Sequence, residues 1–141
     1  MTSIIVDTSV VVKWYAQVSE DHVYEARELR KRIVDGDYSL VCPEVIILEL
    51  INALRIGKKL APDECIQSVH SFIALCAQLA PTPNVDAIVS VVYQHAMASY
   101  DAVFVALAQE RNMSLVTADY THHKKSVSPH IIWLNEWKYT D

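Results

Sequence analysis

The sequence predicts an α/β fold, an α/β/α sandwich with a mostly parallel central sheet of about five strands. Short apolar runs rich in β-branched residues alternate along the chain with longer stretches of helical spacing, which is the pattern of repeated strand–helix units. A length of 141 residues and an apolar content of 52% suit one core. We therefore expect a single domain over residues 1–141.

Turn and cap residues divide the chain into elements. The expected strands are short and apolar, and they cover 4–6, 38–42, 78–83, 115–117 and 131–133. The expected helices cover 9–15, 19–34, 43–56, 62–77 and 84–98, followed by a sixth that restarts after 99–101 and a short one capped by Thr121. Ser19 and Asn84 are suitable N-cap residues, and Pro43 and Pro62 suit first helical turns.

Composition excludes several classes of protein. Only two glycines occur, so neither a P-loop nor a dinucleotide-binding loop can be built. The N-terminal residues lack a secretory signal, and charges interrupt every candidate membrane span, so we expect a cytoplasmic protein without a membrane segment. Three cysteines without CxxC spacing argue for free thiols, and the sequence leaves open whether Cys65 and Cys76 pair.

The charge pattern is ambiguous for a nucleic-acid binder. The net charge is −5, but basic residues cluster over 27–32, 55–59 and 122–125. Such clusters can follow a phosphate backbone, or they can be ordinary solvated helix faces. For 27–32 we favour solvated faces because Glu25 and Glu28 interleave with it. The histidines of the third cluster, His122 and His123, are expected at the surface or facing RNA.

Four carboxylates lie in or beside apolar stretches, where they are rare: Asp7, Glu49, Asp101 and Asp119. Burying an isolated carboxylate costs several kcal/mol unless it is paired or bound to a cation. Asp7 and Asp119 each follow a predicted strand, and they would lie side by side if the first and fourth strands are neighbours. A divalent cation with hard oxygen ligands, Mg²⁺ or Mn²⁺, is the simplest agent that would stabilise all four together.

Each acid also has a purely structural explanation. Asp7 and Asp101 could cap the helices that they precede, and Asp119 could be a turn residue. Glu49 could pair with Arg55 in a buried network. One shared site accounts for all four acids, whereas the structural explanations require four separate coincidences.

The order and spacing of the acidic segments resemble those of PIN-domain ribonucleases, and the nearest likeness is to VapC-type toxins of toxin–antitoxin pairs. The segments that carry the resemblance are Asp7-Thr8-Ser9, Pro43 to Leu54 with Glu49 and Asn52, Tyr100-Asp101-Ala102 continuing to Ala108, and Val116-Thr117-Ala118-Asp119. The resemblance covers essentially the whole chain. It implies a PIN-like sheet flanked by helices, cleavage of single-stranded or structured RNA, a magnesium or manganese cofactor, a homodimer and a cognate small antitoxin.

The resemblance also implies a role for each site residue. Asp7, Asp101 and Asp119 would hold the metal, Glu49 would complete the shell directly or through water, and Thr117 would hydrogen-bond the carboxylates or metal-bound water. An RNA-processing nuclease and a non-catalytic PIN scaffold remain as alternatives. A phosphoacceptor receiver domain does not fit, because Asp7 stands without an adjacent acid after the first strand.

The helix expected over 43–56 is too apolar for burial on one side only. Together with the resemblance, this predicts a homodimer with some of its apolar side chains near the contact, namely Val45, Ile46, Leu50 and Leu54.

Overall fold

A parallel sheet of five strands forms the centre of the computed structural model, which describes residues 2–138. The strand order is β3-β2-β1-β4-β5, and every neighbouring pair is parallel. The strands are β1 (Thr2–Val6), β2 (Tyr38–Pro43), β3 (Cys76–Ala80), β4 (Ser114–Thr117) and β5 (Ile131–Trp133). This architecture confirms the predicted fold class. Met1 and residues 139–141 of the predicted domain span lie outside the described residues.

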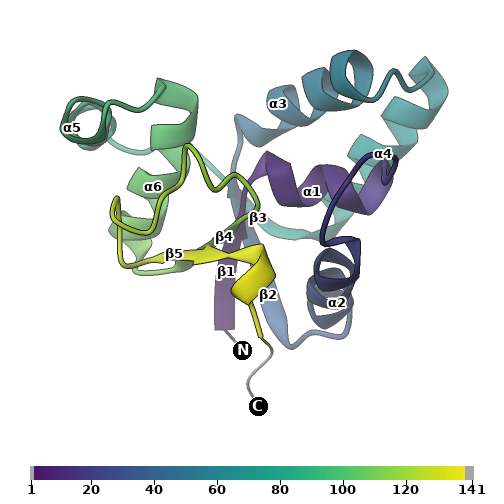
Figure 1. Cartoon of the computed structure of the whole chain (residues 1–141), viewed down its shortest axis with the longest axis horizontal. Coiled ribbons are helices and arrows are strands. Elements are labelled where there is room, and N and C mark those ends of the chain that lie inside the picture. Colours follow the sequence, from purple (N-terminus) through teal and green to yellow (C-terminus); the bar gives the residue numbers. More distant parts are fainter. Residues whose placement is uncertain (1, 139–141) are drawn as a thin grey trace.

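Helices cover both faces of the sheet, with α5 and α6 on one side and α1 to α4 on the other (Figure 1). The helices are α1 (Thr8–Tyr15), α2 (Val23–Val34), α3 (Ile46–Asn52), α4 (Pro62–Leu75), α5 (Val85–His95) and α6 (Ser99–Arg111). A π-helical turn, η1 (Ala53–Gly57), continues α3, and a 3₁₀ turn, η2 (Leu134–Glu136), follows β5. No helix in the described part of the chain has the length and apolar character needed to cross a bilayer.

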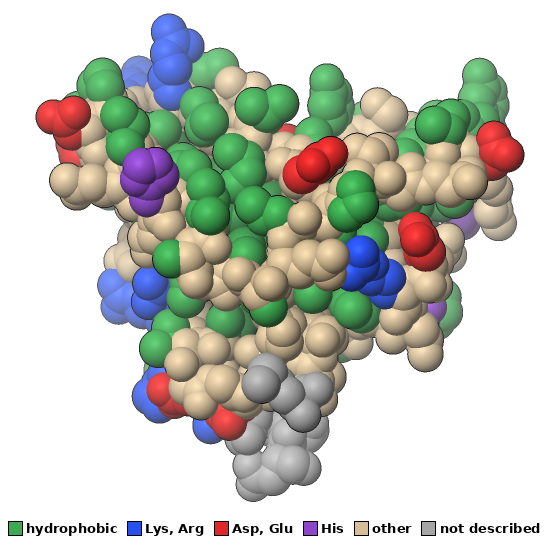
Figure 2. Space-filling view, turned by 180° about the vertical axis from the view of Figure 1, so that it is seen from behind, with side chains coloured by type: hydrophobic (Ala, Val, Ile, Leu, Met, Phe, Trp, Pro, Cys, Tyr) green, Lys and Arg blue, Asp and Glu red, His purple; other side chains and the backbone are tan. Residues whose placement is uncertain are grey.

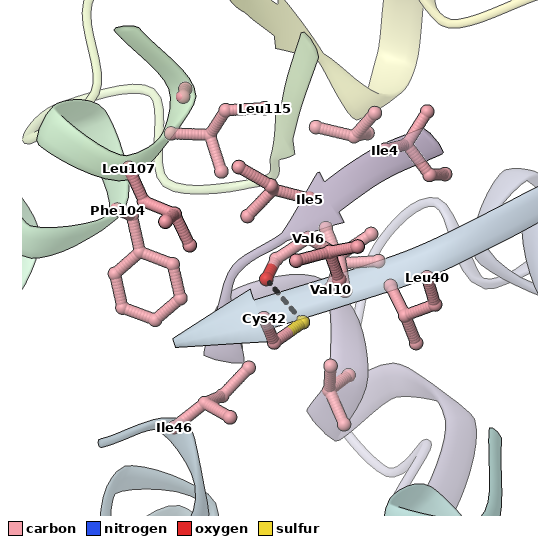
Figure 3. Packing of buried hydrophobic residues seen from close by; sticks show 14 of the residues in the cluster. Ile4, Ile5, Val6, Val10, Leu40, Cys42, Ile46, Phe104, Leu107 and Leu115 are labelled. Carbon is pink, nitrogen blue, oxygen red and sulfur yellow. Dashed lines mark hydrogen bonds between the residues drawn. The ribbon is translucent and has the colours of Figure 1, made fainter. Parts of the chain in front are cut away.

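The central strand explains why the first apolar run is so hydrophobic. Ile5 and Val6 of β1 are fully buried because helices cover both faces of a parallel sheet. Phe104 and Leu107 of α6 pack on one side of the strands, and Val10 of α1 lies close to Val6 (Figure 3). The core therefore fixes the strand whose carboxyl end carries Asp7.

The second helix begins at Val23, so the predicted N-cap at Ser19 is wrong. Ser19 and His22 have positive φ angles of 61° and 55°, which an α-helix cannot contain. A buried lysine holds the loop instead, because Lys13 Nζ donates to Glu20 Oε1 at 3.0 Å and to the carbonyl of Asp21 at 2.6 Å.

Pro43 ends β2 and does not open the following helix, contrary to expectation. Its neighbour Glu44 donates its amide to the carbonyl of Ala80, so the extended pairing with β3 continues past the proline. The helix begins only at Ile46 and turns into the π-helical segment at Ala53, where the amide of Lys58 donates to the carbonyl of Ala53 at 3.0 Å.

Three further boundaries differ from the predictions. α4 ends at Leu75 and β3 starts at once at Cys76, so the third strand lies two residues earlier than expected. α6 already begins at Ser99, which places Asp101 inside its first turn. The chain after Thr121 forms turns where a short helix was expected.

The three cysteines are free thiols. Cys42 is buried and donates to the carbonyl of Val6 at 3.4 Å (Figure 3). Burial, together with a contact to Cys76 on the neighbouring strand, raises the pKa of the Cys42 thiol well above its usual value. The cysteine in contact with Cys76 is thus Cys42, and the pairing of Cys76 with Cys65 that the sequence left open is not formed.

Three of the four residues predicted near a dimer contact face the core of their own chain. Ile46, Leu50 and Leu54 are fully buried within the single chain, whereas Val45 is only partly buried. The apolar side chains that this segment leaves exposed are Leu48, Ile51 and Ile56.

This difference in burial predicts a difference in stability between neighbouring residues of the π-helical turn. Leu54→Ala should lower the free energy of unfolding by about 2–5 kcal/mol because it opens a cavity in the core. Ile56→Ala, at a side chain 63% exposed, should cost under about 1 kcal/mol. Urea unfolding of both variants measures the difference, and equal losses would contradict the assignment of Leu54 to the core.

Candidate functional site

The candidate site lies at the carboxyl ends of the two central strands. Asp7 follows β1 directly, and Thr117 is the last residue of β4. The two strands are adjacent and parallel, and the amide of Asp7 donates to the carbonyl of Val116 at 3.3 Å. The neighbouring position of the first and fourth strands, which the predicted site required, is therefore present.

Two hydroxyl groups hold the carboxylate of Asp7. Ser9 Oγ donates to its Oδ1, and Thr117 Oγ1 donates to its Oδ2 at 2.5 Å. Backbone amides orient these hydroxyls, since Ala118 N donates to Ser9 Oγ at 2.9 Å and Asp119 N donates to Thr117 Oγ1 at 3.0 Å. Asp7 stands at the N-cap position of α1, but its side chain makes no capping hydrogen bond. The capping explanation for Asp7 is thus wrong.

Burial makes this carboxylate costly to ionise. Asp7 is only 4% exposed, and desolvation raises its pKa above the usual value. The charge of His123 and the hydrogen bonds from Ser9 and Thr117 oppose that rise, whereas the charge of Asp119 adds to it. Asp7 is therefore a buried acid whose neighbours compensate for only part of its desolvation.

Glu49 approaches from α3 and is only half satisfied. Thr8 Oγ1 donates to its Oε2 at 2.9 Å, but the buried Oε1 has no hydrogen-bond partner. Burial and the charges of Asp101 and Asp7 raise the pKa of Glu49 to about 7, against the effect of the Thr8 hydrogen bond. Among the described residues, no ion pair joins Glu49 to Arg55, so the structural explanation for this acid finds no support.

Asp101 lies in the first turn of α6, where the helix dipole favours a negative charge. The residue at the N-cap is Ala98, so Asp101 does not serve as the cap. Its side chain is 25% exposed and lies within electrostatic range of Glu49. The fold thus brings together three acids, Asp7, Glu49 and Asp101, from three separate elements.

Asp119 lies close enough to influence Asp7, but its oxygens are engaged elsewhere. Oδ1 accepts the amide of His122 at 3.1 Å, and Oδ2 lies 2.8 Å from His122 Nδ1. Burial raises the pKa of Asp119, but the hydrogen bonds from His122 outweigh it and the net pKa is lowered. In this structure Asp119 stabilises the turn that follows it, as the structural explanation for this acid supposed. Its role as a metal ligand stays a prediction.

His123 is a site residue that the sequence reasoning missed. We expected both adjacent histidines at the surface, and His122 is indeed exposed. His123 is only 1% exposed, and its Nε2 lies 3.5 Å from Asp7 Oδ2 and 3.7 Å from Asp101 Oδ1. The only sequence signal was its place four residues after Asp119, which cannot distinguish an inward from an outward side chain.

The donor chemistry of the site fits a hard divalent cation. Three carboxylates meet, and one buried carboxylate oxygen, Glu49 Oε1, has no partner. In residues 2–138, however, no group of three or more His, Cys, Asp or Glu side chains is arranged to hold a metal ion. The carboxylate oxygens are therefore the type of ligand that such a cation prefers, but the side chains would have to rearrange to bind it.

The protein is thus an α/β protein with acidic side chains at the carboxyl ends of its central parallel strands. The model of the PIN domain family matches residues 4–127, and the chain belongs to that family. PIN domains are generally nucleases, and PIN nucleases generally use divalent metal ions.

A solved structure is similar over almost the whole chain. The crystal structure of PAE2754 from Pyrobaculum aerophilum matches with a TM-score of 0.68 at 18% sequence identity. The match covers 95% of this chain and 90% of that one, and it supports the PIN-like fold. No curated protein matches the sequence.

The raised pKa of Glu49 predicts how stability depends on pH. The folded protein holds the Glu49 proton more tightly than the unfolded chain, so without metal the stability should fall as the pH rises from 4.5 to about 7. Glu49→Gln should reduce this fall, leaving the part due to Asp7, and it should be more stable than the parent at about pH 8, by on the order of 1 kcal/mol after discounting for partial exposure.

Urea unfolding at a series of pH values, with a chelator present, measures the effect. Glu44→Gln is the matched control, because it removes an exposed carboxylate five residues earlier. Identical pH profiles for the parent and Glu49→Gln would contradict the assignment.

Proposed function

We propose that this chain is a Mg²⁺- or Mn²⁺-dependent endoribonuclease that cleaves single-stranded or structured RNA, and that it is the toxin of a toxin–antitoxin pair. The observation that carries the catalytic part is the meeting of Asp7, Glu49 and Asp101, of which Glu49 has an unpartnered buried oxygen. Membership of the PIN family supports nuclease activity, and the likeness of the four motifs to VapC-type proteins supports the toxin role.

The chain's own residues have separate parts in this proposal. Asp7, Asp101 and Glu49 would hold the cation, and Asp119 would join them after release from His122. A bound divalent cation lowers the pKa of a coordinated water and stabilises negative charge on a phosphodiester. Ser9 and Thr117 keep Asp7 in one orientation, so that its carboxylate needs no reorganisation when the substrate arrives.

Several residues of the basic clusters already form ion pairs with acidic side chains of the same chain, and others do not. In the first cluster, Lys31 pairs with Asp35 and Arg32 with Asp37, which agrees with the interpretation of solvated faces. In the second, Lys58 pairs with Glu20 at 2.6 Å. The third cluster begins three residues after Asp119, and its Lys125 pairs with Glu136. Its exposed Lys124 is our candidate for contacting the RNA backbone near the cut.

Removal of single acids should separate catalysis from folding. Asp101→Asn and Asp7→Asn should lower the rate of cleavage of single-stranded RNA by at least about 100-fold, because each removes a charged ligand without changing size. Both variants should keep the parental far-UV circular dichroism. The measurement is a single-turnover cleavage assay with Mn²⁺ or Mg²⁺.

The matched control is again Glu44→Gln, which should cut RNA at the parental rate. If Asp101→Asn cleaves RNA as fast as the parent in nuclease-free preparations, the proposed site is wrong. Added Mn²⁺ should also raise the melting temperature of the parent more than that of Asp7→Asn, since binding to the native state stabilises it.

An apolar groove formed by α3, the π-helical turn and α4 is suited to the proposed antitoxin. It has a volume of about 500 Å³, and its lining includes Ile51, two residues after Glu49 in the sequence. Hydrophobic side chains gather on this side of the molecule (Figure 2). Leu60, Ile66 and Val69 continue its lining, with Arg55 at its side. An amphipathic antitoxin helix would place its apolar face here and a basic side chain on Asp7, Asp101 or Asp119.

Antitoxin binding and metal binding should therefore compete. Co-expression with the adjacent small reading frame should yield a complex, and rising Mn²⁺ should weaken it. Replacing the antitoxin's basic residue should restore cleavage without dissolving the complex. If no small protein co-purifies and expression alone leaves growth unchanged, the toxin role fails, and an RNA-processing nuclease becomes the better interpretation.

A homodimer remains part of the proposal, with its contact moved to other residues. The exposed apolar side chains of α5 and of the start of α6 include Val85, Val89, Tyr93 and Tyr100. α5 and α6 lie on the side of the sheet opposite α1 to α4 (Figure 1). Their exposed apolar side chains are the candidates for the contact between subunits. A dimer contact at α5 and α6 would leave Leu48, Ile51 and Ile56 exposed on the side of the molecule that carries the groove.

A further inference from the structure

A polar pocket of about 290 Å³ lies beside the candidate site. One wall consists of Ala118 and Tyr120, the two residues that flank Asp119 after β4. The opposite wall includes residues 19–22 of the loop between α1 and α2. The amide of Ala118 donates to Ser9 Oγ, one of the hydroxyls that orient the buried carboxylate, so the pocket and the acidic site share one stretch of backbone.

The loop that forms this pocket is strained, and a buried lysine holds it. Ser19 and His22, which both line the pocket, adopt positive φ angles, and such conformations concentrate at functional sites. Lys13 is 5% exposed, and two of its three N–H groups donate to Glu20 Oε1 and to the carbonyl of Asp21. The third N–H makes no hydrogen bond within the described part of the chain. The loop is therefore fixed in an unfavourable conformation around an open polar pocket, which stability alone does not explain.

The charges that line the pocket favour an uncharged ligand with N–H groups. Glu20 already pairs with Lys13 at 3.0 Å and with Lys58 at 2.6 Å. The carboxylate of Asp21 has no hydrogen-bond or ion-pair partner among the described residues. A phosphate would meet this carboxylate with like charge, whereas an N–H donor would bind to it.

Tyr120 gives the pocket an aromatic wall. Its ring packs against Trp133 with 5.1 Å between the ring centroids, and its hydroxyl accepts the amide of Asn135 at 3.3 Å, so the ring is fixed at two points. Burial raises the pKa of Tyr120, and the charges of Glu25 and Asp21 add to the rise, which places Asp21 within electrostatic range of this wall. Proteins that recognise RNA stack unpaired bases on aromatic side chains and bind the edges of those bases with polar groups.

We propose that this pocket binds a guanine base of the RNA substrate beside the cleaved bond, with Asp21 as the specificity-determining residue. The inference rests on the proposed nuclease function. Guanine presents two adjacent donors, N1–H and the N2 amino group, which match the two oxygens of one carboxylate, and its O6 can accept the third N–H of Lys13. Adenine, cytosine and uracil place an acceptor beside the donor on the same edge, so each would bind the carboxylate through one hydrogen bond only.

Nucleotide binding can be measured without cleavage. Guanosine 5′-monophosphate, titrated into the ¹⁵N-labelled full-length protein with a chelator present, should shift the amide resonances of residues 19–22 and 118–120. The other three ribonucleoside monophosphates and inorganic phosphate should shift them much less. Inosine 5′-monophosphate lacks the N2 amino group, and it should bind at least about five-fold more weakly than the guanosine compound.

A pair of variants tests the carboxylate itself. Asp21→Asn should bind the guanosine and inosine nucleotides equally, because an amide has one acceptor oxygen where a carboxylate has two. Asp86→Asn, at an exposed acid of α5 on the other side of the sheet, should keep the parental difference. In single-turnover cleavage, the parent should cut a guanine-containing RNA at least about five-fold faster than the same RNA with inosine in place of guanine, and Asp21→Asn should cut both at equal rates.

The contrary outcomes separate this proposal from the nuclease function. Equal binding of all the nucleotides, or equal shifts with inorganic phosphate, overturns the guanine pocket and leaves the nuclease standing. A parental preference that persists in Asp21→Asn overturns the role of Asp21. Selective binding of guanosine 5′-monophosphate by a parent that cuts no RNA supports the pocket and overturns the proposed function. The comparison of the guanosine and inosine nucleotides on the parent decides the question even if Asp21→Asn does not fold.

Discussion

The desolvation of one carboxylate, that of Asp7, is the constraint around which the rest of the site is arranged. Asp7 follows β1 at its carboxyl end, beside β4, where only 4% of the residue is exposed to water. Two hydroxyls, each oriented by a backbone amide, and one histidine compensate for part of the lost hydration. Repulsion between the acids makes ionisation costlier again: Asp119 raises the pKa of Asp7, and Asp7 and Asp101 raise that of Glu49. Without a cation, the fold is therefore less stable than it would be with apolar side chains at these positions.

Sequence reasoning predicted the sheet well because its signals are local. Short apolar runs identify four of the strands closely, the third strand was expected two residues too late, and the alternation with helices predicts the parallel order. It also selected Asp7, Glu49 and Asp101, because a carboxylate in an apolar run is unusual wherever it occurs, and Glu49 lies within electrostatic range of the other two. Thr117 was predicted beside them, and its hydroxyl does contact Asp7.

The features that were missed depend on tertiary context. Ser19 has the chemistry of an N-cap, but the buried Lys13 ties down the chain that follows and delays the helix to Val23. The direction of His123 depends on a turn whose hydrogen bonds involve Asp119 and Trp133, and no residue pattern encodes it. Asp119 also depends on this turn. The strand before Asp119 was predicted correctly, but the contact of Asp119 with His122 was not predicted.

The pairing of β1 with β4 also determines when during synthesis the acidic site can exist. Asp7 and the hydroxyl of Thr117 that binds it are 110 positions apart in the sequence. A nascent chain that has emerged only through β3 has Asp7 and Glu49 but lacks Asp101 and the strand that completes the edge of the sheet. Closing so long a loop is slow compared with forming local helices. The site therefore cannot assemble before the chain through β4 has been synthesised, and any activity that depends on the site begins only after that point.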